Sequence, residues 1–128
     1  LISEKCAYLG LDELVPAVGQ GAIGVEVCTA RTDVQSLVAP LNCESSANCV
    51  KAERSMNKIL NGSCQVPIGG HAVIKNDKLV LTGVVASIDG QLLINRRLAA
   101  PKSDAERLGE TLANRLIEAG ADKILSAV

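Results

Sequence analysis

The chain has 128 residues, of which 48% are hydrophobic and 21% are charged, and its formal net charge is −1. This composition favours a folded domain over a disordered chain, and the core must be aliphatic because Tyr8 is the only aromatic residue. The balanced charge and the near absence of aromatic side chains argue against the phosphate attraction and base stacking that nucleic-acid binding uses. No apolar run approaches the roughly 18 residues that would span a bilayer. We therefore expect neither nucleic acid nor a membrane as a partner.

The chain contains five cysteines, an odd count without a C-x-x-C pair. Their spacings suit neither a zinc site nor a disulfide framework, so we expect no metal and we expect reduced thiols. Reduced thiols are typical of a cytosol-like compartment, which predicts a cytoplasmic protein. The cysteines are Cys6, Cys28, Cys43, Cys49 and Cys64.

Residues 1–41 do not make a domain of their own, and Pro40 with the change of character near Asn42 marks a linker to the unit that follows. The alternating Val-Glu-Val of residues 25–27 predicts a strand. Thr32 or Asp33 can cap a short helix that runs through Leu41. Because the chain begins without an initiator methionine, we expect it to be a piece of a longer protein.

Residues 42–128 predict a compact α+β unit. A helix is expected over residues 44–60, because Asn61-Gly62 can adopt the left-handed backbone that ends helices. Three β-branched or aliphatic runs follow, separated by tight-turn dipeptides. They predict a three-stranded antiparallel sheet with helices packed on one face. The expected strands are residues 70–74, 78–87 and 91–99, with turns at Asn76-Asp77 and Asp89-Gly90.

The end of the chain predicts two further helices. Residues 103–106, Ser-Asp-Ala-Glu, match a capping box that would begin the first of them. Gly120 would end it, and residues 122–127 would form a short final helix. The expected buried face consists of Ala105, Leu108, Leu112 and Leu116.

Cys64 lies on a short connector between the end of a predicted helix and Val66-Pro67, which begins an extended segment. A thiol on such a loop can face a cleft, which suits a covalent attachment point. The alternative is a small apolar side chain that fills space under a turn. The partial negative charge at a helix C-terminus does not activate a thiol. The loop is therefore better suited to an attachment formed once than to a rapidly cycling nucleophile.

Residues 19–24, Gly-Gln-Gly-Ala-Ile-Gly, match the pattern G-x-G-x-x-G. A dinucleotide site needs a strand before this pattern and a helix opening at it, whereas here a strand is expected after it. We therefore do not expect nucleotide binding. Closely spaced glycines instead let backbone amides approach a ligand or another segment. Gln20 is the only amide side chain in the pattern that could make directed hydrogen bonds.

Other polar residues have structural interpretations. His71 is the only histidine, and no Ser-His-Asp set can be assembled around it, so we expect a structural role. Glu53 and Arg54 lie in the middle of a predicted helix. A solvated or interdomain salt-bridge face fits them better than a catalytic role does.

Three motifs occur in this order along the chain: LVPAVGQGAIGVE at residues 14–26, AERSMN at residues 52–57 and GSCQVPIG at residues 62–69. Together they closely resemble the porphobilinogen deaminase family, also called the hydroxymethylbilane synthases. The resemblance covers essentially the whole chain, but it corresponds only to the C-terminal part of a family member.

The resemblance implies three domains, of which residues 42–128 would be the third. That domain carries a dipyrromethane cofactor on a loop cysteine, which matches Cys64. Residues 1–15 would close the second domain. Residues 16–41 would be the hinge and the strand and helix that return to the first domain. The N-terminal domains of the same chain and the small molecule porphobilinogen are the implied partners.

The implied reaction joins four porphobilinogen units into hydroxymethylbilane on the primer, with release of ammonia. A thiolate is a good nucleophile for the electrophilic carbon of a deaminated pyrrole. The resemblance places Gln20 and Gly21 at hinge positions that contact the cofactor. It places the catalytic aspartate and the arginine cluster upstream of this chain. We therefore expect no catalytic residue here, and we expect the isolated chain to be inactive and to lack the cofactor.

Two other interpretations remain open. A non-enzymatic α+β interaction domain would offer the open face of its sheet to partners and would use its cysteines structurally. A redox switch would need a resolving cysteine within reach of Cys64, and no sequence neighbour qualifies.

Overall fold

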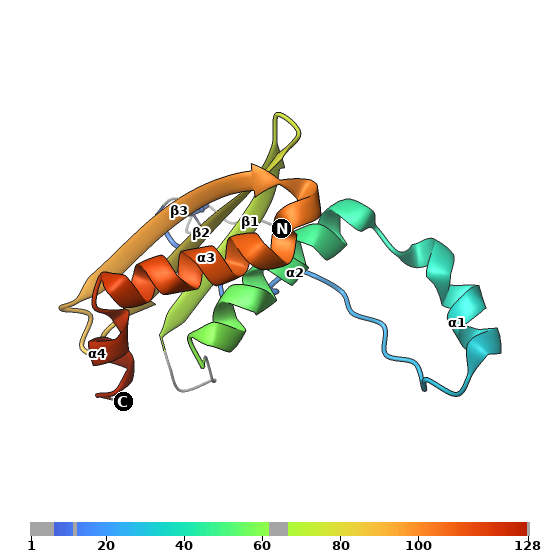
Figure 1. Ribbon diagram of the computed structural model, residues 1–128, viewed down its shortest axis with the longest axis horizontal. Helices are drawn as coiled ribbons and strands as arrows, with labels where there is room; N and C mark the ends of the chain where they lie inside the picture. The colour runs from blue at the N-terminus through green and yellow to red at the C-terminus, as the bar shows by residue number, and fades with distance from the viewer. Residues whose placement is uncertain (1–6, 12, 62–66, 128) are drawn as a thin grey trace.

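The computed structural model describes residues 7–11, 13–61 and 67–127. Its centre is an antiparallel sheet in the order β1-β2-β3 (Figure 1). The strands are β1 (Ile68–Lys75), β2 (Lys78–Ala86) and β3 (Leu93–Pro101). The predicted three-stranded meander is confirmed, and each strand begins and ends within about two residues of its expected bounds, the usual uncertainty of element ends.

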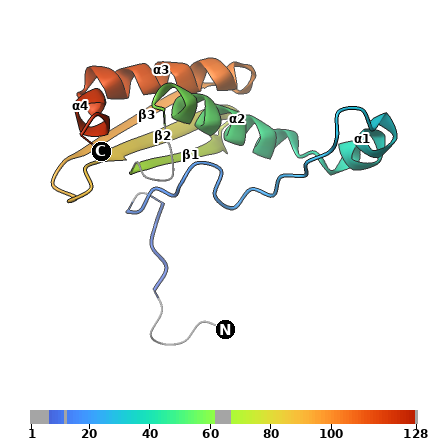
Figure 2. The same ribbon diagram turned by 90° about the horizontal axis from the view of Figure 1, so that it is seen from below.

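Two long helices cover one face of the sheet, as Figure 2 shows. They are α2 (Glu44–Ile59) and α3 (Ala105–Glu118). The short helix α4 (Ala121–Leu125) follows after Gly120, whose φ of 99° lies in the left-handed region that ends α3. The predicted α+β fold with helices on one face is therefore confirmed.

The core lies between this sheet face and the two helices. Alternate residues of β2 point toward the helices, so Leu79, Leu81 and Val85 are fully buried. The predicted face of α3 is buried as well: Ala105, Leu108, Leu112 and Leu116. The helices approach closely at Gly109, where an added Cβ would lie 2.3 Å from the carbonyl oxygen of Ala52 on α2.

The two predicted turns join the strands. Asn76 and Asp77 have φ angles of 49° and 62°, the left-handed pair that a two-residue hairpin loop requires. The Asp77 carboxylate also forms an ion pair with Lys102. At the other hairpin, Gly90 has a φ of 71°, and the Asp89 carboxylate accepts a hydrogen bond from the Gln91 N–H at 3.1 Å.

The capping box predicted at residues 103–106 does not form. The chain enters α3 through a 3-10 turn, η2 (Lys102–Asp104), and no side chain caps the helix. The Ser103 hydroxyl instead donates to the Asp104 carboxylate at 3.0 Å. The sequence pattern matched, but the turn that closes off β3 leaves Ser103 outside the N-cap position.

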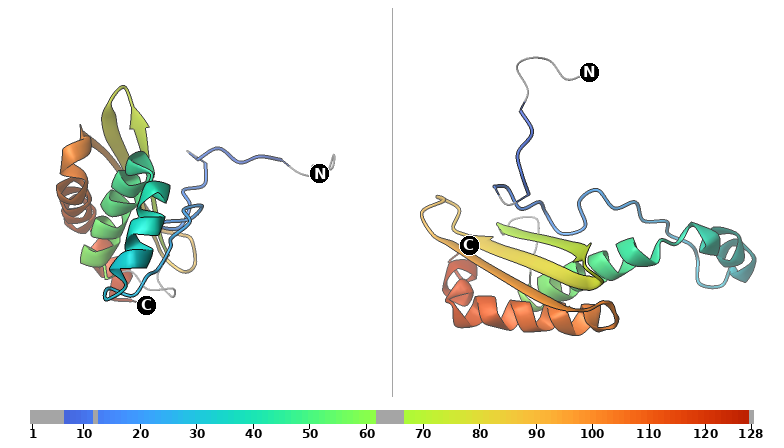
Figure 3. Two further views of the ribbon diagram at one scale, coloured as in Figure 1. Left: turned by 90° about the vertical axis from the view of Figure 1, so that its right-hand side faces the viewer. Right: turned by 90° about the horizontal axis from the view of Figure 1, so that it is seen from above.

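The described residues before α2 form an arm, which passes the free edge of β1 and then extends away from the sheet (Figures 1 and 3). It includes α1 (Thr32–Val38) and the 3-10 turn η1 (Ala39–Leu41), and neither contains a buried residue. Residues 22–28 are not in a strand, so the strand predicted at 25–27 is absent. A strand needs a paired neighbour for its backbone groups, and no described strand lies beside this segment.

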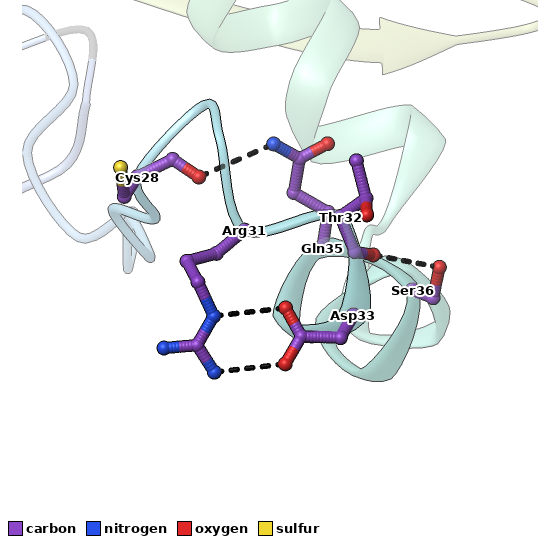
Figure 4. A network of polar contacts seen from close by, with 6 residues as sticks. All are labelled: Cys28, Arg31, Thr32, Asp33, Gln35 and Ser36. Carbon is purple, nitrogen blue, oxygen red and sulfur yellow. Dashed lines mark hydrogen bonds and ion pairs between the residues drawn. The ribbon is translucent and has the colours of Figure 1, made fainter.

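The start of α1 also differs from the prediction. Arg31 is the N-cap and makes no side-chain cap, so neither Thr32 nor Asp33 caps the helix. Asp33 lies two positions past the N-cap, and its carboxylate forms a two-bond ion pair with the Arg31 guanidinium at 2.8 and 2.9 Å (Figure 4). The Gln35 side chain joins the helix to the preceding loop by donating to the carbonyl oxygen of Cys28 at 3.3 Å.

Within the described residues, no helix combines the length and the apolarity that crossing a membrane would require.

Candidate functional site

Cys64 lies outside the described residues, but both flanks of its loop are described. On one side α2 ends, and Asn61 has the left-handed φ of 52° that the Asn-Gly pair predicted. On the other side the Pro67 carbonyl oxygen accepts a hydrogen bond from the Ala86 N–H at 3.0 Å, immediately before β1 begins at Ile68. The described flanks agree with the prediction of a short connector from a helix end to a strand. The connector itself and the orientation of its thiol stay a prediction.

Gln20 and Gly21 lie in two consecutive tight turns. The Gln20 N–H donates to the Ala17 carbonyl at 3.0 Å, and the Ala22 N–H donates to the Gly19 carbonyl at 3.1 Å. Gly19 and Gly21 have φ angles of 74° and 85°, which residues other than glycine rarely adopt. An added Cβ at either glycine would meet no atom within 4 Å, so the turn, and not crowding, requires glycine here.

The segment before this turn is docked on the free edge of β1. The Gly70 N–H donates to the Pro16 carbonyl at 2.9 Å. A Cβ added at Gly69 would lie 3.0 Å from the Val15 carbonyl oxygen, so glycine permits the close approach. The Val18 side chain also packs against the core. The structure thus places the glycine turn beside the strand that follows the cysteine loop, although the two are more than forty residues apart in the sequence.

Glu53 holds this arrangement together from α2. Its carboxylate accepts the Gly19 N–H at 2.7 Å through Oε2 and the Ala72 N–H at 2.7 Å through Oε1. The His71 Nδ1 atom lies 3.9 Å from Oε1. Hydrogen bonds to a charged group each contribute about 1.5–3 kcal/mol to stability.

The expectation that Glu53 lies on a solvated face is therefore wrong, because the residue is 5% exposed. The sequence contained a signal for this. Cys49, Ala52, Glu53, Met56 and Leu60 follow helical spacing, so Glu53 falls on the inward face of α2. Arg54 is exposed, in agreement with a solvated position.

His71 lies beside the Glu53 carboxylate. Its Nε2 atom is buried and has no hydrogen-bond partner in the described part of the chain. Its side chain is 27% exposed, and no cluster of three metal-binding side chains forms anywhere among the described residues. A structural role at the edge of β1 remains the interpretation that fits its position.

The exposed side of the glycine turn suits an anionic ligand. Gln20 is exposed, and its Oε1 atom accepts the Ala17 N–H at 3.1 Å, which orients the amide and leaves its Nε2 group as a donor. Among the described residues nothing accepts a hydrogen bond from the Gly21 N–H. Amide donors complement carboxylates, and dipyrromethane carries carboxylate side chains, so the donor set fits the cofactor that the sequence motifs imply.

The two described cysteines of α2 and its N-terminus differ in environment, which predicts different reactivity. Ser46 Oγ donates to Cys43 Sγ at 3.4 Å and lowers the pKa of the exposed Cys43 thiol. Burial, together with the negative charge of Glu53, raises the pKa of Cys49.

Because the thiolate is the reactive form, iodoacetamide at about pH 7.5 should alkylate Cys43 roughly tenfold faster than Cys49. Peptide mass spectrometry measures both rates. Ser46→Ala should slow Cys43 alone, and equal rates in the unchanged chain would contradict this account.

The fold and the docked turn define a class of protein: an α+β domain that a preceding arm joins along the free edge of its sheet. Residues 47–118, more than half of the chain, match the family model described as porphobilinogen deaminase, C-terminal domain. The chain belongs to the porphobilinogen deaminase family.

Curated relatives agree with this assignment. The porphobilinogen deaminase of Methylobacillus flagellatus is 47% identical over 117 residues, which cover 91% of this chain and 38% of the relative. Those of Laribacter hongkongensis and Thiobacillus denitrificans are 44% and 43% identical, over 94% and 95% of this chain and 39% and 40% of theirs. The chain therefore spans about two fifths of the length of these relatives.

Proposed function

We propose that this chain is the cofactor-bearing C-terminal part of a hydroxymethylbilane synthase, a transferase of tetrapyrrole biosynthesis. The complete enzyme would join four porphobilinogen units, with release of ammonia, on a dipyrromethane primer. The observation that carries the proposal is the docking of the glycine turn on β1: the Gly70 N–H donates to the Pro16 carbonyl at 2.9 Å. It supports a site that combines Gln20 and Gly21 with the Cys64 loop.

In this proposal Cys64 holds the primer through a thioether. When bound, the primer supplies the free pyrrole end that receives the substrate units. The Cys64 sulfur gives its proton to solvent and remains bonded through all additions, because a thioether has no acyl carbon that water could attack. The Gln20 Nε2 group and the Gly21 N–H would donate to carboxylates of the primer and orient it.

The remaining machinery would come from the preceding domains, which would carry the catalytic aspartate and the arginine cluster. The arm offers a surface for them, because apolar side chains are exposed along it: Ile23 is 95%, Leu37 78% and Leu41 72% exposed. Such exposure is typical of surfaces that another domain covers. We propose domain boundaries at residues 1–15, 16–41 and 42–128, and an isolated chain that is inactive and carries no primer.

The free thiols of Cys28, Cys43 and Cys49 are compatible with a reducing compartment, and we propose the cytoplasm. The alternative function, a non-enzymatic interaction domain, would use the uncovered face of the sheet. Family membership favours the enzyme over that alternative.

Mass spectrometry of the complete enzyme that contains this chain tests the proposal. We expect the peptide that contains Cys64 to carry a mass increment of two linked pyrrole units, and the peptides that contain Cys43 and Cys49 to be unmodified. An unmodified Cys64 peptide in active enzyme would overturn the proposal.

A further inference from the structure

Glu53 is the one buried charged side chain among the described residues, and its two carboxylate oxygens join segments that are far apart in the sequence. Oε2 accepts the N–H of Gly19, which is 34 positions earlier, and Oε1 accepts the N–H of Ala72, which is 19 positions later. Both distances are 2.7 Å, which is typical of charge-assisted hydrogen bonds. The carboxylate thus connects the arm, α2 and β1 at one point.

The contact also completes the edge of the sheet. β1 pairs only with β2, so backbone groups of alternate β1 residues point away from the sheet. Two of these N–H groups have acceptors: Gly70 donates to the Pro16 carbonyl and Ala72 donates to Glu53. Unpaired buried N–H groups are costly, so the arm and the carboxylate together take the place of a fourth strand.

A carboxylate is the only side-chain group of this length that can satisfy both amides at once. Glutamine has the same shape, but it offers one oxygen, and its NH2 group would face one of the two N–H donors. Aspartate has two oxygens, but its chain is one methylene shorter, so it cannot reach both amides from the same helix position. The two hydrogen bonds therefore hold Gly19 and Ala72 in a fixed position relative to one another.

We propose that Glu53 is a positioning residue for the primer site. It touches no substrate and acts through Gly19 and Ala72. By fixing the turn that holds Gln20 and Gly21 against β1, it holds the donors that orient the primer in one position. The pair of hydrogen bonds from Gly19 and Ala72 to Glu53 is called the clamp below. The role of Glu53 in catalysis rests on the proposed function, whereas the clamp does not.

Amide hydrogen exchange on the 128-residue chain tests the clamp directly. In the unchanged chain the Gly19 and Ala72 amides should exchange at least about tenfold more slowly than the Gly24 amide, which makes no hydrogen bond to a described residue. Glu53→Gln should remove about tenfold of the protection at Gly19. Glu110→Gln replaces an exposed glutamate on the neighbouring helix and should leave both amides protected. A Gly19 amide that exchanges as fast as that of Gly24 in the unchanged chain overturns the proposal, even if the variant fails to fold.

Kinetics of the complete enzyme test the positioning role. Among molecules whose Cys64 peptide carries the primer, Glu53→Gln should lower kcat about tenfold with little change in KM, because the donors are misplaced in every step. Glu53→Asp should also lower kcat, and Glu110→Gln should not. An unchanged kcat in primer-loaded Glu53→Gln enzyme overturns this inference alone. Active unchanged enzyme without a primer on Cys64 overturns the proposed function instead.

Discussion

Replacing Cys64 by alanine in the complete enzyme is expected to abolish tetrapyrrole formation, lowering the rate by at least about 1,000-fold. The physical reason is that alanine offers no atom to which the primer could bond, so the growing chain has no anchor. Turnover of porphobilinogen and the mass of the residue 64 peptide, measured on the same preparation, check this prediction. Because Cys64 lies between the end of α2 and the start of β1 in the sequence, the variant should fold.

Cys43→Ala is the matched control. Cys43 is exposed at the N-cap of α2, so its replacement removes an accessible thiol without affecting the proposed primer site. This variant should retain full activity and the mass increment on Cys64. If Cys64→Ala enzyme remained active, or if Cys43→Ala removed the primer, the assignment of the anchor would be wrong.

Gly109→Ala is expected to destabilise the 128-residue chain by about 2–3 kcal/mol, although alanine is the better helix former by about 1 kcal/mol. The added Cβ would lie 2.3 Å from the Ala52 carbonyl oxygen, 2.7 Å from Ser55 Cβ and 2.8 Å from the Met56 N atom. Two of these are backbone atoms of α2 that cannot rotate aside. The helices would have to separate, and the core between them and the sheet would loosen. Urea denaturation followed by circular dichroism measures the change in the free energy of unfolding.

Gly24→Ala is the control for this substitution. Gly24 has no positive φ, and a Cβ added there would meet no atom within 4 Å, so stability should change by less than about 0.5 kcal/mol. A Gly109→Ala chain as stable as the unchanged protein would show that α2 and α3 can separate at this point without cost.

The sequence predicted the part of the fold that local interactions specify. β2 alternates buried and half-buried residues, turn dipeptides stand between the strands, and α3 shows helical spacing of leucines. These patterns follow from backbone geometry alone, so they predicted the meander and the helix that covers it. Capping was predicted less well: Ser103 and Asp33 matched cap patterns, but the turns that precede the helices placed them at other positions.

For the candidate site, local sequence was enough to identify the closely spaced glycines around Gln20 and Gly21 and to predict the helix end and the extended segment on either side of the Cys64 loop. It could not predict that this turn lies against β1, because the contact of Pro16 with Gly70 joins residues whose separation leaves no periodic signal. It also gave Glu53 a solvated role, although the helical spacing around that residue indicated burial.

What the sequence determined by itself is therefore the set of elements, their order and the family to which the chain belongs. Only the tertiary structure decided which element meets which. A carboxylate at the middle of a helix is a surface charge in one packing and a buried clamp in another, and the difference lies in two N–H groups that other segments bring to it. Folding removes water from these two N–H groups, so they need the carboxylate as their acceptor. This requirement arises from the folded arrangement and not from any short stretch of residues.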